Sequence, residues 1–232
     1  MITSLGTLYI VSTPIGNLSD ITYRAVEILK TVDIIAAEDT RRSRILLSNY
    51  NIKTKMISYF EHNKYQKIHK IQEILQSGKH VAVITDAGTP AISDPAYKLV
   101  RRAISIGSKI EPIPGPSALL ASIVSSGLPT DRFIFEGFLP PKKGRVKRME
   151  KLIDESATVI IYENTLRLKR TIKQLLEIIG DRPAVICREL TKLHEETIRG
   201  TLSGLLDLLD NKKLKGECVL LIGKDDKNVY FE

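Results

Sequence analysis

The sequence has little that would place it in a membrane or in an oxidising compartment. No apolar run approaches the roughly 20 residues that a membrane-spanning helix needs, so we expect no membrane segment. Residues 1–6 lack a basic region followed by an apolar stretch, and no signal peptide is expected. The two cysteines, Cys187 and Cys218, show neither CxxC nor Cys/His spacing. We therefore expect no metal site and interpret both as core residues of a cytoplasmic protein.

Two common nucleotide-binding signatures are also absent. Neither the GxGxxG turn of dinucleotide-binding folds nor the GxxxxGKS or GxxxxGKT loop of phosphate-binding folds occurs in the chain. The usual sequence evidence for NAD or for ATP is therefore missing.

The composition favours a globular protein with an excess of positive charge. Its 232 residues are 43% hydrophobic and 27% charged, which permits one large domain or two small ones. The formal net charge is +8 and the isoelectric point about 9.4. A basic balance favours a polyanionic partner such as RNA, but an ordinary lysine-rich protein has the same balance.

Strands and helices alternate through the first half of the chain. Apolar runs predict buried strands at 8–12, 33–37, 80–85 and 109–113, and a helical period predicts helices at 21–31, 65–76, 95–105 and 117–125. We interpret Asp20 and Ser117 as N-caps. The alternation predicts a mainly parallel sheet with helices on both faces.

The polar turn at 126–131 is the expected domain boundary. After it, strands are predicted at 132–137, 157–162, 183–188, 197–202 and 217–223, and helices at 168–179 and 204–210. The fold class is therefore α/β, with domains at 1–127 and 128–224. The tail at 225–232 is polar, is expected to be disordered, and resembles the remnant of an engineered protease site.

Four loops rich in glycine, proline and polar residues follow the predicted strands, at 12–17, 86–95, 114–118 and 162–164. In parallel sheets, ligands bind beyond the carboxyl ends of the strands. Glycine lets a backbone approach a ligand closely, and proline fixes the shape of a loop. Together the loops predict a small-molecule site, although any one of them alone is more typical of a simple turn.

The order of the motifs is more specific than any single motif. Between about Leu8 and Gly223 the chain contains, in order, STPIGNL, AEDTRRS, SYFEHN, TDAGTPAISDP, PGPSA, GFLP, YEN, RELTK and GE. This set resembles the ribosomal RNA small-subunit methyltransferase I group of the tetrapyrrole-methylase superfamily. The resemblance implies two α/β domains of the tetrapyrrole-methylase type, with S-adenosylmethionine folded in a cleft between them.

The resemblance also implies which residues contact the cofactor. They are Pro14, Ile15, Gly16, Ala87, Gly88, Thr89, Ile92, Ser117, Ala118, Tyr162 or Glu163, and Glu189 or Leu190. Asn17 stands where the porphyrin enzymes have aspartate, which argues against a porphyrin substrate. Amides at a helix start near Ser117 fit a carboxylate. Asp86 fits a sulfonium or amino charge or, equally, an ordinary turn.

Methyl transfer to a ribose hydroxyl needs that hydroxyl aligned behind the methyl group and an acceptor for its proton. Glu38 matches an acidic residue proposed as proton acceptor in related porphyrin enzymes, and Asp39 and Glu189 are the other catalytic candidates. Substrate contacts are expected from Arg41, His62, Asn63, Arg188 and Lys192. Ion pairs within these clusters, or an ordinary surface role for His62, are the alternatives, and no single general base is assigned.

The segment 142–151 is a second candidate for RNA binding. It carries six positive charges: Lys142, Lys143, Arg145, Lys147, Arg148 and Lys151. Aromatic residues are scarce there, so we expect contact mainly with the phosphate backbone; a solvated helix face is the alternative.

The resemblance further implies the substrate and the partners. It implies methylation of a cytidine ribose of 16S ribosomal RNA near the decoding centre, within a small ribosomal subunit, by a homodimer. A porphyrin or corrinoid C-methyltransferase and a non-catalytic RNA-binding relative are the competing hypotheses.

Overall fold

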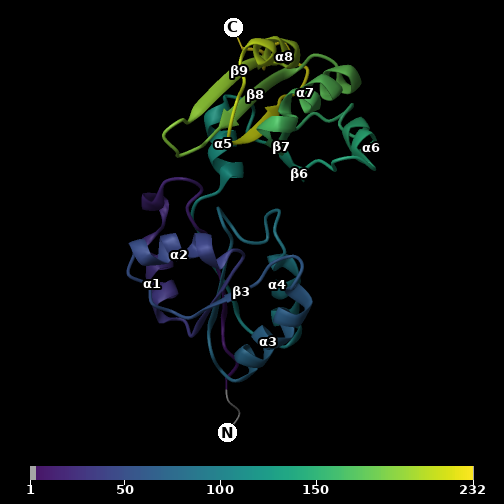
Figure 1. Ribbon diagram of the computed structural model, residues 1–232. Helices are drawn as coiled ribbons and strands as arrows, with labels where there is room; N and C mark the ends of the chain where they lie inside the picture. The colour runs from purple at the N-terminus through teal and green to yellow at the C-terminus, as the bar shows by residue number, and fades with distance from the viewer. Residues whose placement is uncertain (1–3, 232) are drawn as a thin grey trace. The chain divides into compact units, whose positions relative to one another are not determined.

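The computed structural model describes residues 4–231. The chain forms two compact units, Met1–Ser117 and Ala118–Glu232, each with its own sheet (Figure 1). This confirms the α/β fold class. Along the chain, the boundary between the units falls between residues 117 and 118 rather than at 127, because the helix α5 (Ala118–Ser126) packs on strands of the second unit.

The first unit is a five-stranded parallel sheet in the order β3-β2-β4-β1-β5. Its elements in chain order are β1 (Leu8–Val11), the short 3-10 helix η1 (Leu18–Asp20), α1 (Tyr23–Thr31), β2 (Ile34–Ala37), α2 (Thr40–Asn49), β3 (Met56–Ser58), α3 (Lys64–Gln76), β4 (Val81–Ile84), α4 (Ala96–Ser105) and β5 (Ile110–Ile113). Parallel strands place all the loops that follow them at one edge of the sheet.

Two hydrophobic clusters cover the two faces of this sheet. Helices α1 and α2 bury Leu29 and Leu47 on one face, and α3 and α4 bury Leu75 and Leu99 on the other (Figure 1). β4 is buried along its whole length because it lies between these layers.

The sequence patterns missed three elements of this unit, η1, α2 and β3, and misplaced one cap. Charged residues interrupt the apolar period of α2, and β3 has only three residues. The N-cap of α1 is Thr22, whose hydroxyl accepts a hydrogen bond from the Ala25 amide at 3.1 Å. Asp20, the expected cap, lies in η1 instead.

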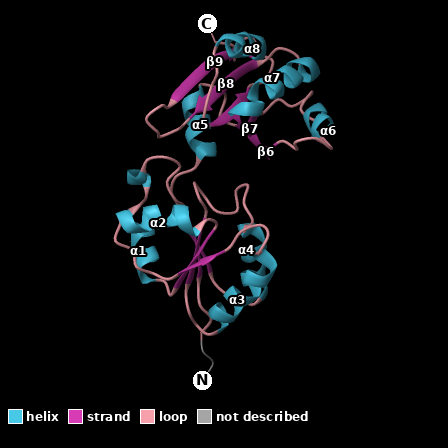
Figure 2. Ribbon diagram, in the orientation of Figure 1, coloured by secondary structure: helices cyan, strands magenta, loops and turns pink. Residues whose placement is uncertain are grey.

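The second unit has a sheet of its own, drawn in magenta in Figure 2. Its strand order is β6-β7-β10-β8-β9; β6 pairs with β7 in parallel, and the other three pairings are antiparallel. After α5 its elements are β6 (Phe133–Phe138), α6 (Arg145–Glu150), β7 (Thr158–Asn164), α7 (Thr165–Ile179), β8 (Pro183–Arg188), β9 (Glu196–Thr201), α8 (Leu202–Asn211) and β10 (Glu217–Ile222). The edge strand expected at 197–202 is β9.

Helices α7 and α8 bury one face of this sheet, and α5 covers the other. Successive strand residues point to opposite faces, so Ile186 joins the α7 cluster while Cys187 lies 3.9 Å from the Ser122 carbonyl of α5. Both Cys187 and Cys218 are buried free thiols, as core residues should be.

The C-terminal tail is ordered as far as Phe231, which corrects the expectation of disorder. Val229 is 9% exposed and packs beside Gly223. The Tyr230 hydroxyl donates to the Asp181 carbonyl at 2.8 Å and lies 2.9 Å from an Asp225 carboxylate oxygen. The polar composition of the tail gave no sign that Val229 would be buried or that Tyr230 would form these hydrogen bonds.

A chain ending at Lys224 is expected to be less stable than the full chain by about 1–3 kcal/mol, because it loses the burial of Val229 and the Tyr230 hydrogen bonds. Denaturant unfolding followed by circular dichroism measures the difference. Tyr230→Phe serves as the partial variant and should lose about 1 kcal/mol. Identical midpoints for the truncated and full chains would show that the tail adds nothing.

Candidate functional site

The loops after β1 and β4 are joined by backbone pairing at the carboxyl edge of the first sheet. The Thr13 amide donates to the Gly88 carbonyl at 2.9 Å, and the Gly88 amide donates to the Thr13 carbonyl at 3.0 Å. The Thr13 hydroxyl donates to the Thr85 carbonyl at 3.0 Å. The first loop and the central turn therefore hold each other in place.

A chain of hydroxyl groups attaches the loop after β5 to the same place. Ser12 Oγ and Thr89 Oγ1 lie 2.9 Å apart, and the Thr89 hydroxyl donates to the Pro116 carbonyl at 3.2 Å. A Cβ atom at Gly115 would approach Ser12 Cβ to 2.9 Å, so only glycine fits there without displacement. Three of the four loops singled out in the sequence thus meet at one edge.

The predicted cofactor contacts in this unit differ in how exposed they are. Pro14, Ile15 and Gly88 are buried, Thr89 and Ser117 are half-buried, and Gly16, Ala87 and Ile92 are exposed. Gly88 has a left-handed backbone with φ of +84°. The exposed backbone on either side of this turn is where a small molecule can approach.

Two acidic residues follow β2, and they are held in different ways. Glu38 accepts a hydrogen bond from the Thr85 hydroxyl at 2.6 Å. Asp39 caps α2 and binds Arg41 through both carboxylate oxygens, at 3.2 and 2.9 Å. The Arg41 hydrogen bonds lower the pKa of Asp39 to about 2. Asp39 is therefore a weak base. Its contacts support the alternative interpretation, in which Asp39 pairs with Arg41 instead of taking a proton from the substrate.

Asp86 links the ends of β2 and β4. It accepts a hydrogen bond from the Asp39 amide at 3.0 Å and pairs with Arg42 at 3.3 Å. Burial raises the pKa of Asp86, and the charge of Glu38 adds to that effect against the Asp39 hydrogen bond. These contacts give Asp86 a role in fixing the turn.

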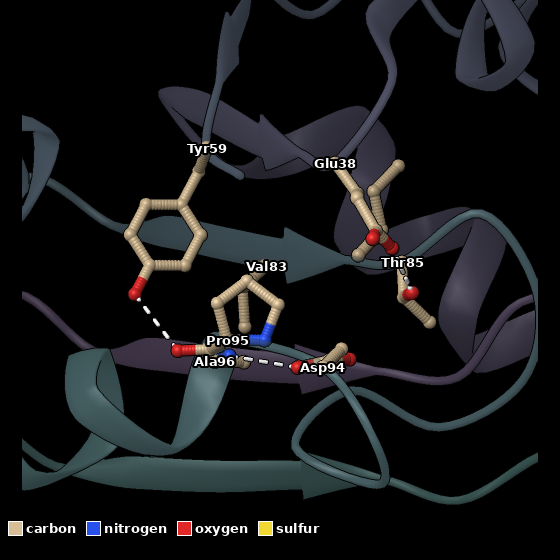
Figure 3. Close-up of a pocket in the computed structure, with 8 residues that line it drawn as sticks. Glu38, Tyr59, Val83, Thr85, Asp94, Pro95 and Ala96 are labelled. Carbon is tan, nitrogen blue, oxygen red and sulfur yellow. Dashed lines mark hydrogen bonds between the residues drawn. The ribbon is translucent and has the colours of Figure 1, made fainter. Parts of the chain in front are cut away.

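A small pocket beside Glu38 contains a second carboxylate that the sequence patterns did not single out. It is lined by Glu38, Tyr59, Val83, Ile84, Thr85, Asp94, Pro95 and Ala96 (Figure 3). Asp94 Oδ1 accepts the amides of Ala91 at 2.8 Å and Ala96 at 2.7 Å. Within residues 4–231, the buried Asp94 Oδ2 has no hydrogen-bond partner.

The surroundings of Asp94 favour its protonated form. Burial raises its pKa above the ordinary value, and the charge of Glu38 raises it further, against the two amide hydrogen bonds. Ala91 and Ser93 beside it have left-handed backbones, with φ of +72° and +65°. The only sequence signal was the SDP triplet at the end of the central motif, which does not say where its carboxylate points.

His62 and Asn63 have different surroundings. His62 is exposed and lies edge-on to Phe60, with ring centroids 6.3 Å apart. Asn63 Oδ1 accepts the Phe60 amide at 2.9 Å, and its amide group donates to the Ser58 hydroxyl at 3.2 Å. Asn63 therefore shapes the turn after β3, and His62 is the more available of the two for a substrate contact.

In the second unit, Glu163 and Arg145 form a buried ion pair. Their side chains are 0% and 4% exposed, with the closest N–O distance 3.5 Å, and Thr171 donates to Glu163 at 2.7 Å. Arg167 binds the other Glu163 oxygen at 2.7 Å. Arg145 also donates to the Pro140 carbonyl at 3.2 Å. Arg145, expected to contact the substrate, is therefore buried and paired inside the unit. The Glu163 carboxylate, expected to contact the cofactor, is already bound by Arg145, Arg167 and Thr171.

The residues after β8 are also engaged with each other. Glu189 has a left-handed backbone with φ of +50°, accepts the Glu217 amide at 2.9 Å, and pairs with Lys192 at 3.0 Å. Burial works to raise the pKa of Glu189, but the hydrogen bonds from Glu217 and Lys192, together with the charges of Lys192 and Arg188, outweigh it and lower the pKa. Leu190 is buried. The ion pair supports the alternative interpretation, in which Glu189 and Lys192 pair with each other instead of acting on the substrate.

Arg188 is held in the same way, because it donates to the Lys215 carbonyl at 3.0 Å and pairs with Glu196 at 3.3 Å. Tyr162 is half-buried, with its ring edge-on to Phe135 and Phe138. Among the second unit's predicted contacts, those that are neither buried nor in an ion pair within residues 4–231 are Ala118, Tyr162, Lys142, Lys143, Lys147 and Lys151.

Within residues 4–231, no helix is long and apolar enough to cross a membrane, and no group of three or more histidine, cysteine or acidic side chains is arranged to hold a metal ion.

The sequence matches the family model "Tetrapyrrole (Corrin/Porphyrin) Methylases" over residues 7–206. Curated proteins named "Ribosomal RNA small subunit methyltransferase I" align over nearly the whole chain. The one from Thermotoga maritima is 46% identical over 95% of this chain and 100% of its own length. The one from Bacillus subtilis is 45% identical over 98% of this chain and 79% of its own length.

Solved structures show the same fold at low sequence identity. A cobalt precorrin-4 methyltransferase superposes with a TM-score of 0.70 at 19% identity, covering 94% of both chains. A uroporphyrin III C-methyltransferase from Thermus thermophilus superposes with a TM-score of 0.68 at 16% identity, covering 94% of this chain and 98% of that one. These likenesses support the architecture alone.

Asp94→Asn is expected to stabilise the protein by about 0.5–2 kcal/mol at pH 7.5. The amide keeps the Oδ1 acceptor and removes the buried charge facing Glu38. Because folding raises the pKa of Asp94, its ionisation costs stability at neutral pH, and the cost vanishes as pH falls below the unfolded value near 4. Thermal unfolding at pH 7.5 and 4 measures this. The exposed Asp154→Asn is the control, and a loss of stability at pH 7.5 would contradict the charge argument.

Arg145→Met is expected to lower the free energy of unfolding by about 3 kcal/mol, because it leaves the buried Glu163 carboxylate with one cation fewer. Arg148→Met is the matched control: Arg148 belongs to the same helix but pairs with Glu136 at the surface, so its loss should be under about 1 kcal/mol. Urea unfolding measures both. Equal losses would show that the Arg145 pair is not the anchor.

Proposed function

Since the chain belongs to the tetrapyrrole (corrin/porphyrin) methylase family, within the group named ribosomal RNA small subunit methyltransferase I, we propose that it methylates the 2′-hydroxyl of a cytidine in small-subunit ribosomal RNA. The methyl donor in this proposal is S-adenosylmethionine, and the nucleotide lies near the decoding centre of 16S RNA. The enzyme works in the cytoplasm as a homodimer on a small ribosomal subunit.

The loop assembly at the ends of β1, β4 and β5 is the observation that carries the proposal. The left-handed backbone of Gly88 and the close approach of Gly115 to Ser12 hold the loops tightly together, and the backbone of Gly16 and Ala87 beside them is exposed. Such an exposed, rigid backbone fits a flat or extended cofactor held by main-chain amides and carbonyls. In the proposal, 14–16, 87–89, Ile92 and Ser117 hold S-adenosylmethionine, and Ala118 and Tyr162 remain contacts that the family resemblance predicts.

The bound cofactor supplies an activated methyl group on a sulfonium, an excellent leaving group. The protein's own task is to hold the ribose hydroxyl in line and take its proton. Glu38 is the residue we assign to the proton. Within residues 4–231 its hydrogen bonds, from the Thr85 hydroxyl and the Asp86 amide, go to Oε2, which leaves Oε1 for the substrate. Arg41 and His62 are exposed and are assigned to the RNA.

The competing functions lack a comparable observation. The porphyrin and corrinoid enzymes resemble this chain only in fold, at 16–19% identity. Asn17 stands at the position of their aspartate. Its side chain accepts the Ser19 amide and caps η1, which is a local structural role. A non-catalytic relative would have no use for Glu38 and Asp94 in one pocket.

Glu38→Gln is expected to lower the rate of methyl transfer about 10²- to 10⁴-fold, because the amide cannot accept the hydroxyl proton. The assay measures transfer of labelled methyl from S-adenosylmethionine to small ribosomal subunits that lack the modification, followed by mapping of the labelled nucleotide. Glu73→Gln, an exposed change on α3, is the matched control and should retain full activity.

Calorimetric titration with S-adenosylmethionine separates binding from chemistry. The proposal requires wild type and Glu38→Gln to bind the cofactor with similar affinity. Label on a base, or on no ribosomal RNA at all despite cofactor binding, would overturn the proposed substrate. Full activity of Glu38→Gln would overturn only the assigned base.

A further inference from the structure

Phe138, the last residue of β6, is an aromatic side chain left in the open. It is 56% exposed, although it lies opposite Tyr162 in the parallel pairing of β6 with β7. Its ring meets the Tyr162 ring edge-on, with centroids 5.6 Å apart, and Tyr162 in turn meets Phe135 edge-on at 4.8 Å. The cluster holds the Phe138 ring in place and leaves part of its surface uncovered.

A β-bulge directs this ring. The register of β6 against β7 shifts between Phe135 and Gly137, so Glu136 is an extra residue, and Gly137 has a left-handed backbone with φ of +63°. Bulges re-aim the side chains that follow them. The Glu136 carboxylate pairs with Arg148 of α6, which fastens the bulge to the basic segment.

The basic segment begins a few residues after Phe138, and its charges are of two kinds. Arg145 and Arg148 are neutralised by Glu163 and Glu136. Lys142, Lys143 and Lys147 are exposed, and none of the three makes an ion pair within the described part of the chain. Arg145 reaches back to the Pro140 carbonyl, which fixes the short connection between the ring and the first lysines.

We propose that Phe138 is a stacking platform for an unpaired RNA base, with Lys142, Lys143 and Lys147 binding the phosphates beside it. Single-stranded RNA is recognised by this combination of an exposed aromatic ring and nearby positive charge. Four residues of chain reach at most about 14 Å, so the ring and Lys142 serve neighbouring nucleotides. The platform extends the proposed function, because it identifies a surface for the substrate strand apart from the reacting nucleotide.

This proposal adds a base contact to the contact expected mainly with the phosphate backbone. The basic segment itself has no aromatic residue between 142 and 151, but the strand end preceding it supplies one. A protein partner is less suited to the site, because a single ring among lysines is a small apolar contact for a protein interface.

Phe138→Leu tests the stacking. It preserves an apolar side chain but removes the aromatic face, and it should weaken binding of a fluorescently labelled single-stranded RNA 12-mer by about 5- to 150-fold. Phe133→Leu, at the other end of β6 and 38% exposed, is the matched control and should change binding by less than about twofold. RNA with abasic positions should bind wild type and Phe138→Leu alike.

Phe138→Trp supplies a direct readout, because the sequence has no tryptophan of its own. It should restore RNA binding, and its fluorescence should be quenched when RNA is added. Lys142→Ala combined with Lys143→Ala should reduce the slope of log affinity against log salt by about 1.4.

Two results would overturn the proposal. One is unchanged RNA binding by Phe138→Leu. The other is a loss of S-adenosylmethionine affinity in Phe138→Leu with RNA binding intact, which would assign the ring to the cofactor's adenine. Failure of the proposed function has a different signature, since wild type would then bind RNA through Phe138 and yet transfer no methyl group to small subunits.

Discussion

The backbone pairing between Thr13 and Gly88 is the constraint on which the candidate site depends. It joins loops separated by more than seventy residues, and its two hydrogen bonds fix the turn whose exposed backbone we assign to the cofactor. The hydroxyls of Ser12 and Thr89 extend the same assembly to the loop after β5. A parallel sheet makes this possible, because it delivers every strand's carboxyl end to one edge.

The acidic residues around this edge differ chiefly in what holds them. Asp39 is engaged by Arg41, and Asp86 spans the ends of β2 and β4. Glu38 is held by a neutral hydroxyl, and in the same pocket Asp94 Oδ2 has no hydrogen-bond partner among residues 4–231. Neither Glu38 nor Asp94 is paired with a cation within residues 4–231, so of these four acidic residues this pair is the one open to a reacting group.

In the second unit, charge serves mainly to build the structure. The Arg145–Glu163 pair fixes the segment before α6, and Lys192 with Glu189 fixes the turn after β8. A buried guanidinium needs a carboxylate to offset its desolvation, and the pair then determines where the chain around it lies. By using some cations as anchors, the unit leaves a distinct set of lysines beside Phe138 for a partner.

The sequence by itself determined the α/β class, most strands and helices, and the three loops that meet, because periodicity and glycine-proline turns are local signals. The ordered motifs also indicated the family that the comparisons confirmed. Tertiary structure alone decided the rest. It made Arg145 an anchor while Lys142 stayed exposed, brought Asp94 beside Glu38, and ordered the tail through Val229 and Tyr230. Burial and ion pairing join residues distant in the chain, so composition and spacing do not reveal which charge is engaged and which is available for chemistry.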